Sequence, residues 1–202
     1  MKLYFAKGAC SLTVRIILHE VNLAAEFEEV DLKTKKTKSG RDFFEINPKG
    51  VVPVLELDQN TILTENSVIL QYIADKHQQT THLPPVNELK RYRVLEWLNY
   101  ISTELHKSCG ALFNPMFNQE VKNNVFIPLL KKKLDYVNTH LANKEFLLGD
   151  TFTLPDAYLF VILSWLKIFN IPLSDWENSH KYFNHLAKRP SIQKALKEEG
   201  FI

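Results

Sequence analysis

A single cysteine near the amino terminus has the residue type and the position for thiol chemistry. Cys10 follows a predicted strand at Lys2–Ala6 and precedes Ser11, which we expect to cap a helix. The N–H groups at a helix N-terminus favour an anion, which should lower the pKa of the Cys10 thiol toward neutrality. A buried, inert cysteine is the alternative. Thr13 stands where a CxxC motif would place a resolving thiol, so a reactive Cys10 needs an external thiol partner.

Two later segments have residue types that suit peptide binding. Pro53 interrupts a strand-like run, and we predict a cis Val52–Pro53 bond that turns the Val52 backbone toward a bound peptide. An edge strand with a trans proline is the alternative. Glu65 and Asn66 open a predicted helix whose N–H groups suit a carboxylate, while Glu65 suits an ammonium group. The alternative is that Glu65 only complements the positive end of the helix dipole and binds no ligand.

The elements that must position these residues alternate between strand and helix over residues 1–80. The order is β-α-β, a variable segment, then β-β-α. The predicted strands after the first are Phe27–Asp31, Val51–Leu57 and Asn60–Leu63, with a turn at Asp58-Gln59-Asn60. The predicted helices are Ser11–Val21 and Glu65–His77, the second with an inner face of Val68, Ile69, Tyr72 and Ile73. This pattern predicts a small α/β domain at residues 1–80.

The rest of the chain shows helical patterns only. Residues 81–86 form a proline-containing linker, and residues 87–202 are predicted to be an all-helical domain. Thr153 and Asp156 form a capping box before an apolar helix at Ala157–Leu166, which must lie at the centre of a bundle. The other predicted helices are Glu88–Lys107, Phe126–Leu141, Tyr182–Ala187 and Ile192–Glu199.

Composition excludes several classes of protein. The chain has 202 residues with 45% hydrophobic residues, which indicates a globular protein, and its formal charge of +2 gives no general affinity for nucleic acid. The longest apolar run is too short to span a membrane. The six glycines form no GxGxxG, GxxxxGK or GxSxG motif, and no CxxC, HxxxH or HExxH spacing indicates a metal site. We expect a cytoplasmic protein with no metal, membrane or nucleic-acid partner.

An ordered set of motifs resembles one enzyme family. The motifs are Gly8-Ala9-Cys10-Ser11, Asn47-Pro48-Lys49-Gly50-Val51-Val52-Pro53, Leu63-Thr64-Glu65, Glu96-Trp97-Leu98-Asn99-Tyr100, Thr103-Glu104-Leu105-His106-Lys107 and Phe152-Thr153-Leu154-Pro155-Asp156-Ala157-Tyr158. Together they resemble the glutathione transferases, and Cys10 together with the predicted helix Glu88–Lys107 resembles the bacterial beta class specifically. The resemblance implies a thioredoxin-like glutathione-binding domain followed by a helical-bundle domain with an electrophile pocket.

The resemblance also assigns roles in the first domain. Cys10 would lie beside the glutathione sulfur and could form a mixed disulfide with it, while the Val52 backbone, ahead of Pro53, would clamp the cysteinyl part. Glu65 and Asn66 would hold the γ-glutamyl end. Many transferases have serine where Asn66 stands, so Ser67 is a competing donor. Lys35 would meet the glycyl carboxylate.

In the second domain the resemblance implies that Asn99, Thr103, Glu104, Leu105 and His106 line the site, partly across the interface of a homodimer. His106 is a candidate hydrogen-bond partner for the sulfur region and, with Cys10, a candidate catalytic residue. The pocket for a small hydrophobic electrophile is expected around Phe113, Phe117 and Trp165, although apolar residues there equally suit a core.

Three functions follow from the resemblance and stay open at this point. The first is conjugation of the glutathione thiolate to hydrophobic electrophiles, a detoxification reaction. The second is glutathione-dependent thiol–disulfide exchange or peroxide reduction, with Cys10 as the nucleophile. The third is a binding module that reuses the fold without catalysis.

Overall fold

The computed structural model describes residues 1–58 and 61–202, and the chain forms two compact units. The first comprises residues 1–79 and 189–202, and the second comprises residues 80–188. The predicted turn at Asp58-Gln59-Asn60 includes two positions outside the described residues. The sequence pattern placed segment 189–202 with the helical domain. In the structure it packs against the first helix through ion pairs of Glu198 and Glu199 with the buried Arg15, which helical periodicity alone does not reveal.

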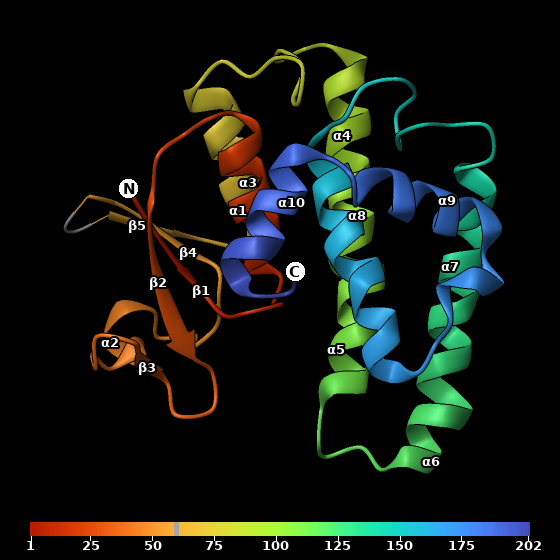
Figure 1. The fold of residues 1–202 in the computed structure, drawn as a ribbon, viewed down its shortest axis with the longest axis horizontal. Coiled ribbons are helices and arrows are strands. Elements are labelled where there is room, and N and C mark those ends of the chain that lie inside the picture. The colour runs from red at the N-terminus through yellow and green to blue at the C-terminus, as the bar shows by residue number, and fades with distance from the viewer. Residues whose placement is uncertain (59–60) are drawn as a thin grey trace. The chain divides into compact units, whose positions relative to one another are not determined.

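The first unit contains a five-stranded mixed sheet with helices beside it (Figure 1). Its strands are β1 (Lys2–Phe5), β2 (Glu26–Asp31), β3 (Lys36–Thr37), β4 (Val54–Asp58) and β5 (Thr61–Thr64). Its helices are α1 (Ser11–Glu20), α2 (Phe43–Ile46), α3 (Asn66–Lys76) and α10 (Pro190–Glu199). The sheet order is β3-β2-β1-β4-β5, with β1 parallel to β2 and antiparallel to β4. The predicted β-α-β and β-β-α halves are confirmed, and the variable segment supplies β3 and α2.

Helices α1, α3 and α10 pack together in this unit (Figure 1). Because α1 contacts both other helices and the strand β1, the whole segment from Ser11 to Leu18 is buried. The predicted inner face of α3 is wrong for Val68, which is 44% exposed. The buried apolar stripe consists of Ile69, Leu70, Ile73 and Ala74. These residues have the spacing i, i+1, i+4, i+5, so the face of α3 that packs on its neighbours is rotated away from Val68.

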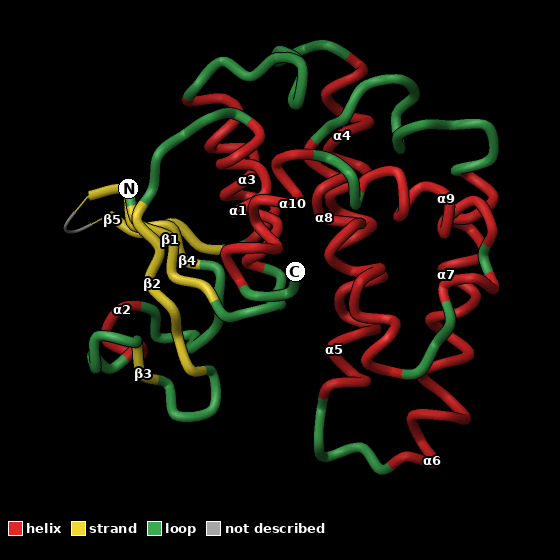
Figure 2. Tube along the Cα trace, viewed as in Figure 1, coloured by secondary structure: helices red, strands yellow, loops and turns green. Residues whose placement is uncertain are grey.

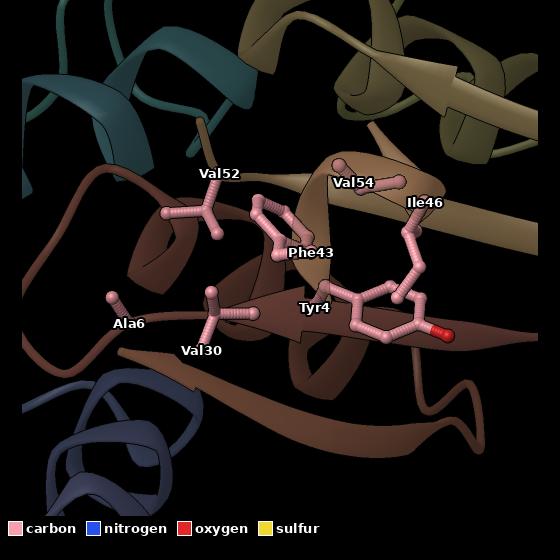
Figure 3. Packing of buried hydrophobic residues seen from close by; sticks show 7 residues of the cluster. All are labelled: Tyr4, Ala6, Val30, Phe43, Ile46, Val52 and Val54. Carbon is pink, nitrogen blue, oxygen red and sulfur yellow. The ribbon is translucent and has the colours of Figure 1, made fainter. Parts of the chain in front are cut away.

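A second apolar cluster lies where α2 meets the sheet. Its members come from the central strands, from α2 and from the segment before β4, and they are Tyr4, Ala6, Val30, Phe43, Ile46, Val52 and Val54. Figure 3 shows the Phe43 ring reaching toward Val52, and its centroid is 6.0 Å from that of Tyr4. The cluster therefore anchors Val52 by its side chain and leaves its backbone groups available for other contacts.

The second unit is helical throughout its regular structure, apart from one isolated bridge between Phe146 and Gly149 (Figure 2). Its α-helices are α4 (Leu89–Tyr100), α5 (Lys107–Phe113), α6 (Gln119–Val121), α7 (Ile127–His140), α8 (Leu154–Ser164) and α9 (Glu177–Leu186). Two π-helical segments, Ile101–His106 and Lys122–Phe126, join α4 to α5 and α6 to α7. Short 3-10 helices occupy Trp165–Phe169 and Leu173–Asp175.

The predicted capping box is confirmed at the start of α8. The Thr153 N–H and hydroxyl both donate to the Asp156 carboxylate at 2.7 Å. The same carboxylate accepts a hydrogen bond from the Leu147 N–H at 2.8 Å and one from the Tyr182 hydroxyl at 2.7 Å. Burial nevertheless raises the pKa of Asp156. The box opens a helix whose residues from Leu154 to Leu163 are all buried, as its uniformly apolar sequence predicts.

Within the described ranges, no helix is long and apolar enough to cross a membrane. The same part of the chain contains no group of three or more His, Cys, Asp or Glu residues placed to hold a metal ion.

Candidate functional site

Cys10 lies at the N-cap position of α1, immediately after the turn that follows β1. Cys10 is 9% exposed, and its thiol donates to the Val52 carbonyl oxygen at 3.4 Å. This contact brings together two residues that the sequence assigned separately to one site, the thiol and the candidate peptide clamp.

The expected lowering of the Cys10 pKa is wrong for this structure. Burial raises the pKa of the thiol to about 12, and the charge of Glu65 adds to the rise. Hydrogen bonds from the N–H groups of Cys10 and Ser11 act in the opposite direction but are outweighed. Position at a helix start is visible in the sequence, whereas the loss of water around the sulfur depends on tertiary packing.

Ser11 does not cap α1, contrary to the sequence expectation. It is the first helical residue, and its wholly buried hydroxyl bonds both the N–H and the carbonyl of Ala6 at 3.2 Å. Ser11 therefore closes the turn between β1 and α1. This use of the hydroxyl fixes the loop that carries Cys10.

The Val52–Pro53 peptide bond is cis, as predicted. It lies outside the sheet, since β4 begins at Val54 rather than at Val51. The Asn47 side chain donates to the Val51 carbonyl at 2.8 Å and holds this segment from the preceding loop.

The start of α3 contains buried polar groups without partners. Asn66 is 6% exposed, and among the described residues neither its amide nitrogen nor its amide oxygen has a hydrogen-bond partner. The buried hydroxyl oxygen of Ser67 is likewise unpaired within the described part of the chain. Buried polar groups are almost always bonded, so this cluster indicates a place for a polar ligand.

Glu65 precedes Asn66 with a positive φ of 70°. Its carboxylate pairs with the Lys49 ammonium at 2.5 Å, and Lys49 also donates to the Thr64 hydroxyl at 2.8 Å. An ammonium group thus occupies the place that the sequence assigned to a cationic ligand group. The sequence gives no sign of this role for Lys49, because its partner Glu65 lies in another segment.

Lys35 lies beside the same loop region. Its ammonium donates to the Gly50 carbonyl at 2.8 Å, and its own carbonyl accepts the Phe43 N–H at 2.8 Å. Its position next to the segment before Val52 agrees with a role at one end of an extended peptide.

In the second unit, His106 is the last residue of the π-helical segment Ile101–His106. It does not lie at a solvent-exposed helix end, because α5 continues from Lys107. Its Nδ1 lies 2.6 Å from the Tyr158 hydroxyl, and its ring is 5.1 Å from that of Trp165. π-helical turns occur frequently at functional sites. Tyr158 was missed by sequence reasoning because an apolar helix that is buried all round gives no sign of which hydroxyl has a polar partner.

The neighbours of His106 have other contacts. Thr103 donates to the Asn99 carbonyl at 3.0 Å, and both side chains are exposed. Glu104 pairs with Lys133 at 3.0 Å, and Leu105 is wholly buried. The Leu105 side chain therefore belongs to the core, and only its backbone could meet a ligand.

The aromatic residues expected around an electrophile divide into two groups. Phe113 contacts Trp165 with ring centroids 5.3 Å apart and Phe169 at 4.6 Å, which extends the cluster that includes His106. Phe117 packs instead on Phe126 at 4.8 Å. Phe169, which sequence reasoning did not name, is recognisable only through this contact.

The second unit also has two open cavities, of about 540 and 450 Å³. The larger lies between the linker and α4, where Pro84, Pro85 and Lys90 are among its lining residues. The smaller lies beside Asn170 and Phe183. His106, Tyr158, Trp165 and the phenylalanines named above line neither of them.

Comparison with known proteins covers most of the chain. The family model for the glutathione S-transferase N-terminal domain matches residues 8–76, and the model for the C-terminal domain matches residues 102–190. Glutathione S-transferase GstA of Escherichia coli O157:H7 is 44% identical over 200 residues, which cover 99% of each chain.

Two solved structures are similar over the full length of both chains. A sphingomonad glutathione S-transferase complexed with glutathione has a TM-score of 0.94 and 37% identity, with 100% of each chain covered. A bacterial beta class glutathione S-transferase of Sphingomonas chungbukensis has a TM-score of 0.95 and 39% identity, again with 100% of each chain covered.

Proposed function

The chain belongs to the glutathione S-transferase family, and we propose that it conjugates the glutathione thiolate to hydrophobic electrophiles at a site around Cys10, Val52 and Asn66. The observation that carries this proposal is the buried amide of Asn66, which has no hydrogen-bond partner among the residues that the structure describes. It belongs to the same compact unit as the Cys10–Val52 hydrogen bond. A tripeptide with a charged end and a thiol would use both features.

Each part of glutathione has a complementary group in this unit. The Asn66 amide and the Ser67 hydroxyl would donate to the γ-glutamyl carboxylate, and Glu65 would receive the ammonium group in exchange for Lys49. The Val52 backbone would pair with the cysteinyl residue, as in strand addition. The Lys35 ammonium would neutralise the glycyl carboxylate.

The raised pKa of Cys10, about 12, determines its role in the proposed reaction. At neutral pH the thiol keeps its proton and acts as a hydrogen-bond donor. It would turn from the Val52 carbonyl to the glutathione sulfur and stabilise that sulfur as the thiolate. The glutathione proton passes to water, the sulfur forms a bond to the electrophilic carbon, and the leaving group departs with the bonding electron pair.

Glutathione-dependent thiol–disulfide exchange or peroxide reduction is the competing enzymatic function. It requires Cys10 as a thiolate, and the burial that raises its pKa disfavours that form. A mixed disulfide between Cys10 and glutathione remains compatible with conjugation as a resting form. A non-catalytic binding module would not need the unpaired donors at the start of α3.

Several further features belong to the same proposal. The helical unit would supply the electrophile pocket, with Phe113 and Trp165 as its apolar surface and His106 as a second donor to the sulfur. Asn99 and Thr103 would contribute across the interface of a homodimer. The cytoplasm, where glutathione keeps thiols reduced, is the expected location.

The first experiment is intact mass spectrometry under non-reducing conditions after exposure to oxidised glutathione. Because burial disfavours the Cys10 thiolate, the wild-type protein should gain one glutathione only slowly, and the Cys10→Ser variant should gain none. A rapid gain would favour the exchange function. Isothermal titration with reduced glutathione should detect binding to both proteins. Absence of binding to the wild-type protein would falsify the proposed function and favour the binding module.

A further inference from the structure

The carboxyl-terminal helix makes a direct contact with the loop that carries Cys10. The Gly8 N–H donates to Glu199 Oε2 at 2.7 Å, although 191 positions separate the two residues. Gly8 has a φ of 67° and lies in the turn between β1 and Cys10. A turn in this left-handed conformation depends on contacts such as this one to keep a single geometry.

The carboxylate of Glu199 is itself held in place. Its side chain is fully buried, and its other oxygen accepts from Arg15 Nε at 3.1 Å. The Arg15 guanidinium lies over two aromatic rings, 4.2 Å from the Phe5 centroid and 3.9 Å from the Phe27 centroid. Since the arginine cannot move without losing both rings, the carboxylate is fixed relative to β1 and α1.

A second residue of the same terminus covers the turn. A Cβ atom built on Gly8 would lie 2.9 Å from the ring of Phe201, so this ring packs directly on the glycine. The turn is therefore restrained by the hydrogen bond that the Gly8 N–H donates to Glu199 and by packing from Phe201, and the chain reaches Cys10 two residues later.

We propose that Glu199 is a positioning residue for the thiol, because its bond to Gly8 fixes the turn that holds Cys10 beside the Val52 carbonyl. The helix α10 thus has a role beyond its packing against α1. It determines how deeply the sulfur is buried and where it meets a bound thiol. This inference rests on the proposed function for the role of Cys10 but not for the geometry of the turn.

The neighbouring Glu198 provides a matched control. It pairs with the same arginine, at 2.9 Å from Arg15 Nη1, and also with His19 at 2.8 Å. The Glu198 carboxylate bonds to these two α1 side chains, whereas the Glu199 carboxylate accepts from the Gly8 N–H and from Arg15. Glu198→Ala therefore weakens the attachment of α10 without removing the bond to Gly8.

The test is the pH dependence of Cys10 alkylation by iodoacetamide, with the label located by peptide mass spectrometry. Glu199→Ala removes one restraint on the turn and leaves the Ser11–Ala6 bonds in place. The looser turn should expose the thiol, which should raise the alkylation rate at pH 8 about tenfold and move the rate profile to lower pH. Glu198→Ala should stay within about twofold of wild type, even if its melting temperature falls. Equal rates in the two variants, or an unchanged rate in Glu199→Ala, would overturn the proposal.

Two further variants keep the test decisive if Glu199→Ala does not fold. Glu199→Gln retains an oxygen that can accept the Gly8 N–H, so its Cys10 rate should return toward the wild-type value. Phe201→Ala removes a side chain that is 48% exposed, so folding should survive while the alkylation rate rises. An unchanged rate in Phe201→Ala together with a raised rate in Glu199→Gln would contradict the proposed positioning role.

The Michaelis constant for glutathione separates this proposal from the proposed function. A positioning role predicts a raised constant in Glu199→Ala and an unchanged one in Glu198→Ala. If no variant, including wild type, binds glutathione, the proposed function fails, while the alkylation rates still decide the role of Glu199.

Discussion

The Cys10 thiol donates a hydrogen bond to the Val52 carbonyl oxygen, from a position 42 residues earlier in the chain. This contact joins the start of α1 to the segment that precedes β4. It places the protein's own sulfur against the backbone group that the family resemblance assigns to the cysteinyl part of glutathione. The thiol therefore already has the donor role that the proposed reaction requires of it.

Substitution of Cys10 should separate hydrogen bonding from covalent chemistry. A serine hydroxyl can still donate to the glutathione sulfur, so Cys10→Ser should keep kcat/KM for an activated chloronitrobenzene within about tenfold of wild type. Cys10→Ala removes the donor and should lower it further. Steady-state kinetics of the three proteins is the measurement. Complete loss of conjugation in Cys10→Ser would instead indicate a nucleophilic Cys10.

Substitution of Asn66 should stabilise the protein and weaken glutathione binding. The amide is buried without partners among the described residues, so Asn66→Leu should raise the free energy of unfolding by about 1 kcal/mol. The Michaelis constant for glutathione should rise because a donor to the γ-glutamyl carboxylate is lost. Urea denaturation and steady-state kinetics measure the two effects.

Asn47 is the control for this substitution. It is also buried, but its amide donates to the Val51 carbonyl and its oxygen accepts the Lys49 N–H. Asn47→Leu should therefore lower the free energy of unfolding. If Asn66→Leu also lowers it, the amide has a structural partner and does not await a ligand.

Substitution of Asp156 should destabilise the helical unit. The carboxylate accepts hydrogen bonds from Thr153, Leu147 and Tyr182, and an asparagine at this position would offer one oxygen in place of two. We expect Asp156→Asn to lower the free energy of unfolding by about 2–4 kcal/mol. Asp150→Asn, at an exposed position in the preceding loop, should change it by less than about 0.5 kcal/mol. Similar losses in both variants would contradict the structural role of the capping box.

Alkaline pH should destabilise the protein through buried phenols. Burial and then Glu56 raise the pKa of Tyr4 to about 12, and burial and then Asp156 raise that of Tyr182 well above 10. A raised pKa in the folded state gives stability that is present below the unfolded value of 10.0 and is lost as the pH rises toward the folded value. For Tyr4 alone the loss at pH 11 is about 1 kcal/mol.

Urea denaturation at several pH values between about 8 and about 11 measures this loss. Tyr4→Phe should flatten the dependence, and Tyr72→Phe, at a partly buried position on α3, serves as the comparison. A dependence of the same slope in wild type and in Tyr4→Phe would show that the Tyr4 phenol does not contribute.

The sequence was sufficient for the family and for the order of elements. The predicted transferase fold is confirmed by matches to both domain models, and the cis Val52–Pro53 bond and the capping box at Thr153 are confirmed by the structure. The capping box is a local motif, whereas the fold and the cis proline were predicted from the order of several motifs along the chain.

The errors fall where the outcome depends on residues far away in the chain. Ser11 bonds to Ala6 instead of capping α1, the buried face of α3 is rotated away from Val68, and α10 packs with the first unit. Helical periodicity indicates an apolar stripe, but the neighbouring elements decide which side of it is covered.

The sequence by itself thus determined which residues are available: a thiol at the start of α1, a proline ahead of β4 and an acidic residue ahead of α3. Only the tertiary structure decided whether these residues are buried and which groups they contact. The thiol is buried, so its pKa is raised; Lys49 pairs with Glu65; and Glu199 reaches Gly8 from the other end of the chain. Residue type and spacing are local properties, whereas solvation and long-range hydrogen bonds exist only once the chain has packed.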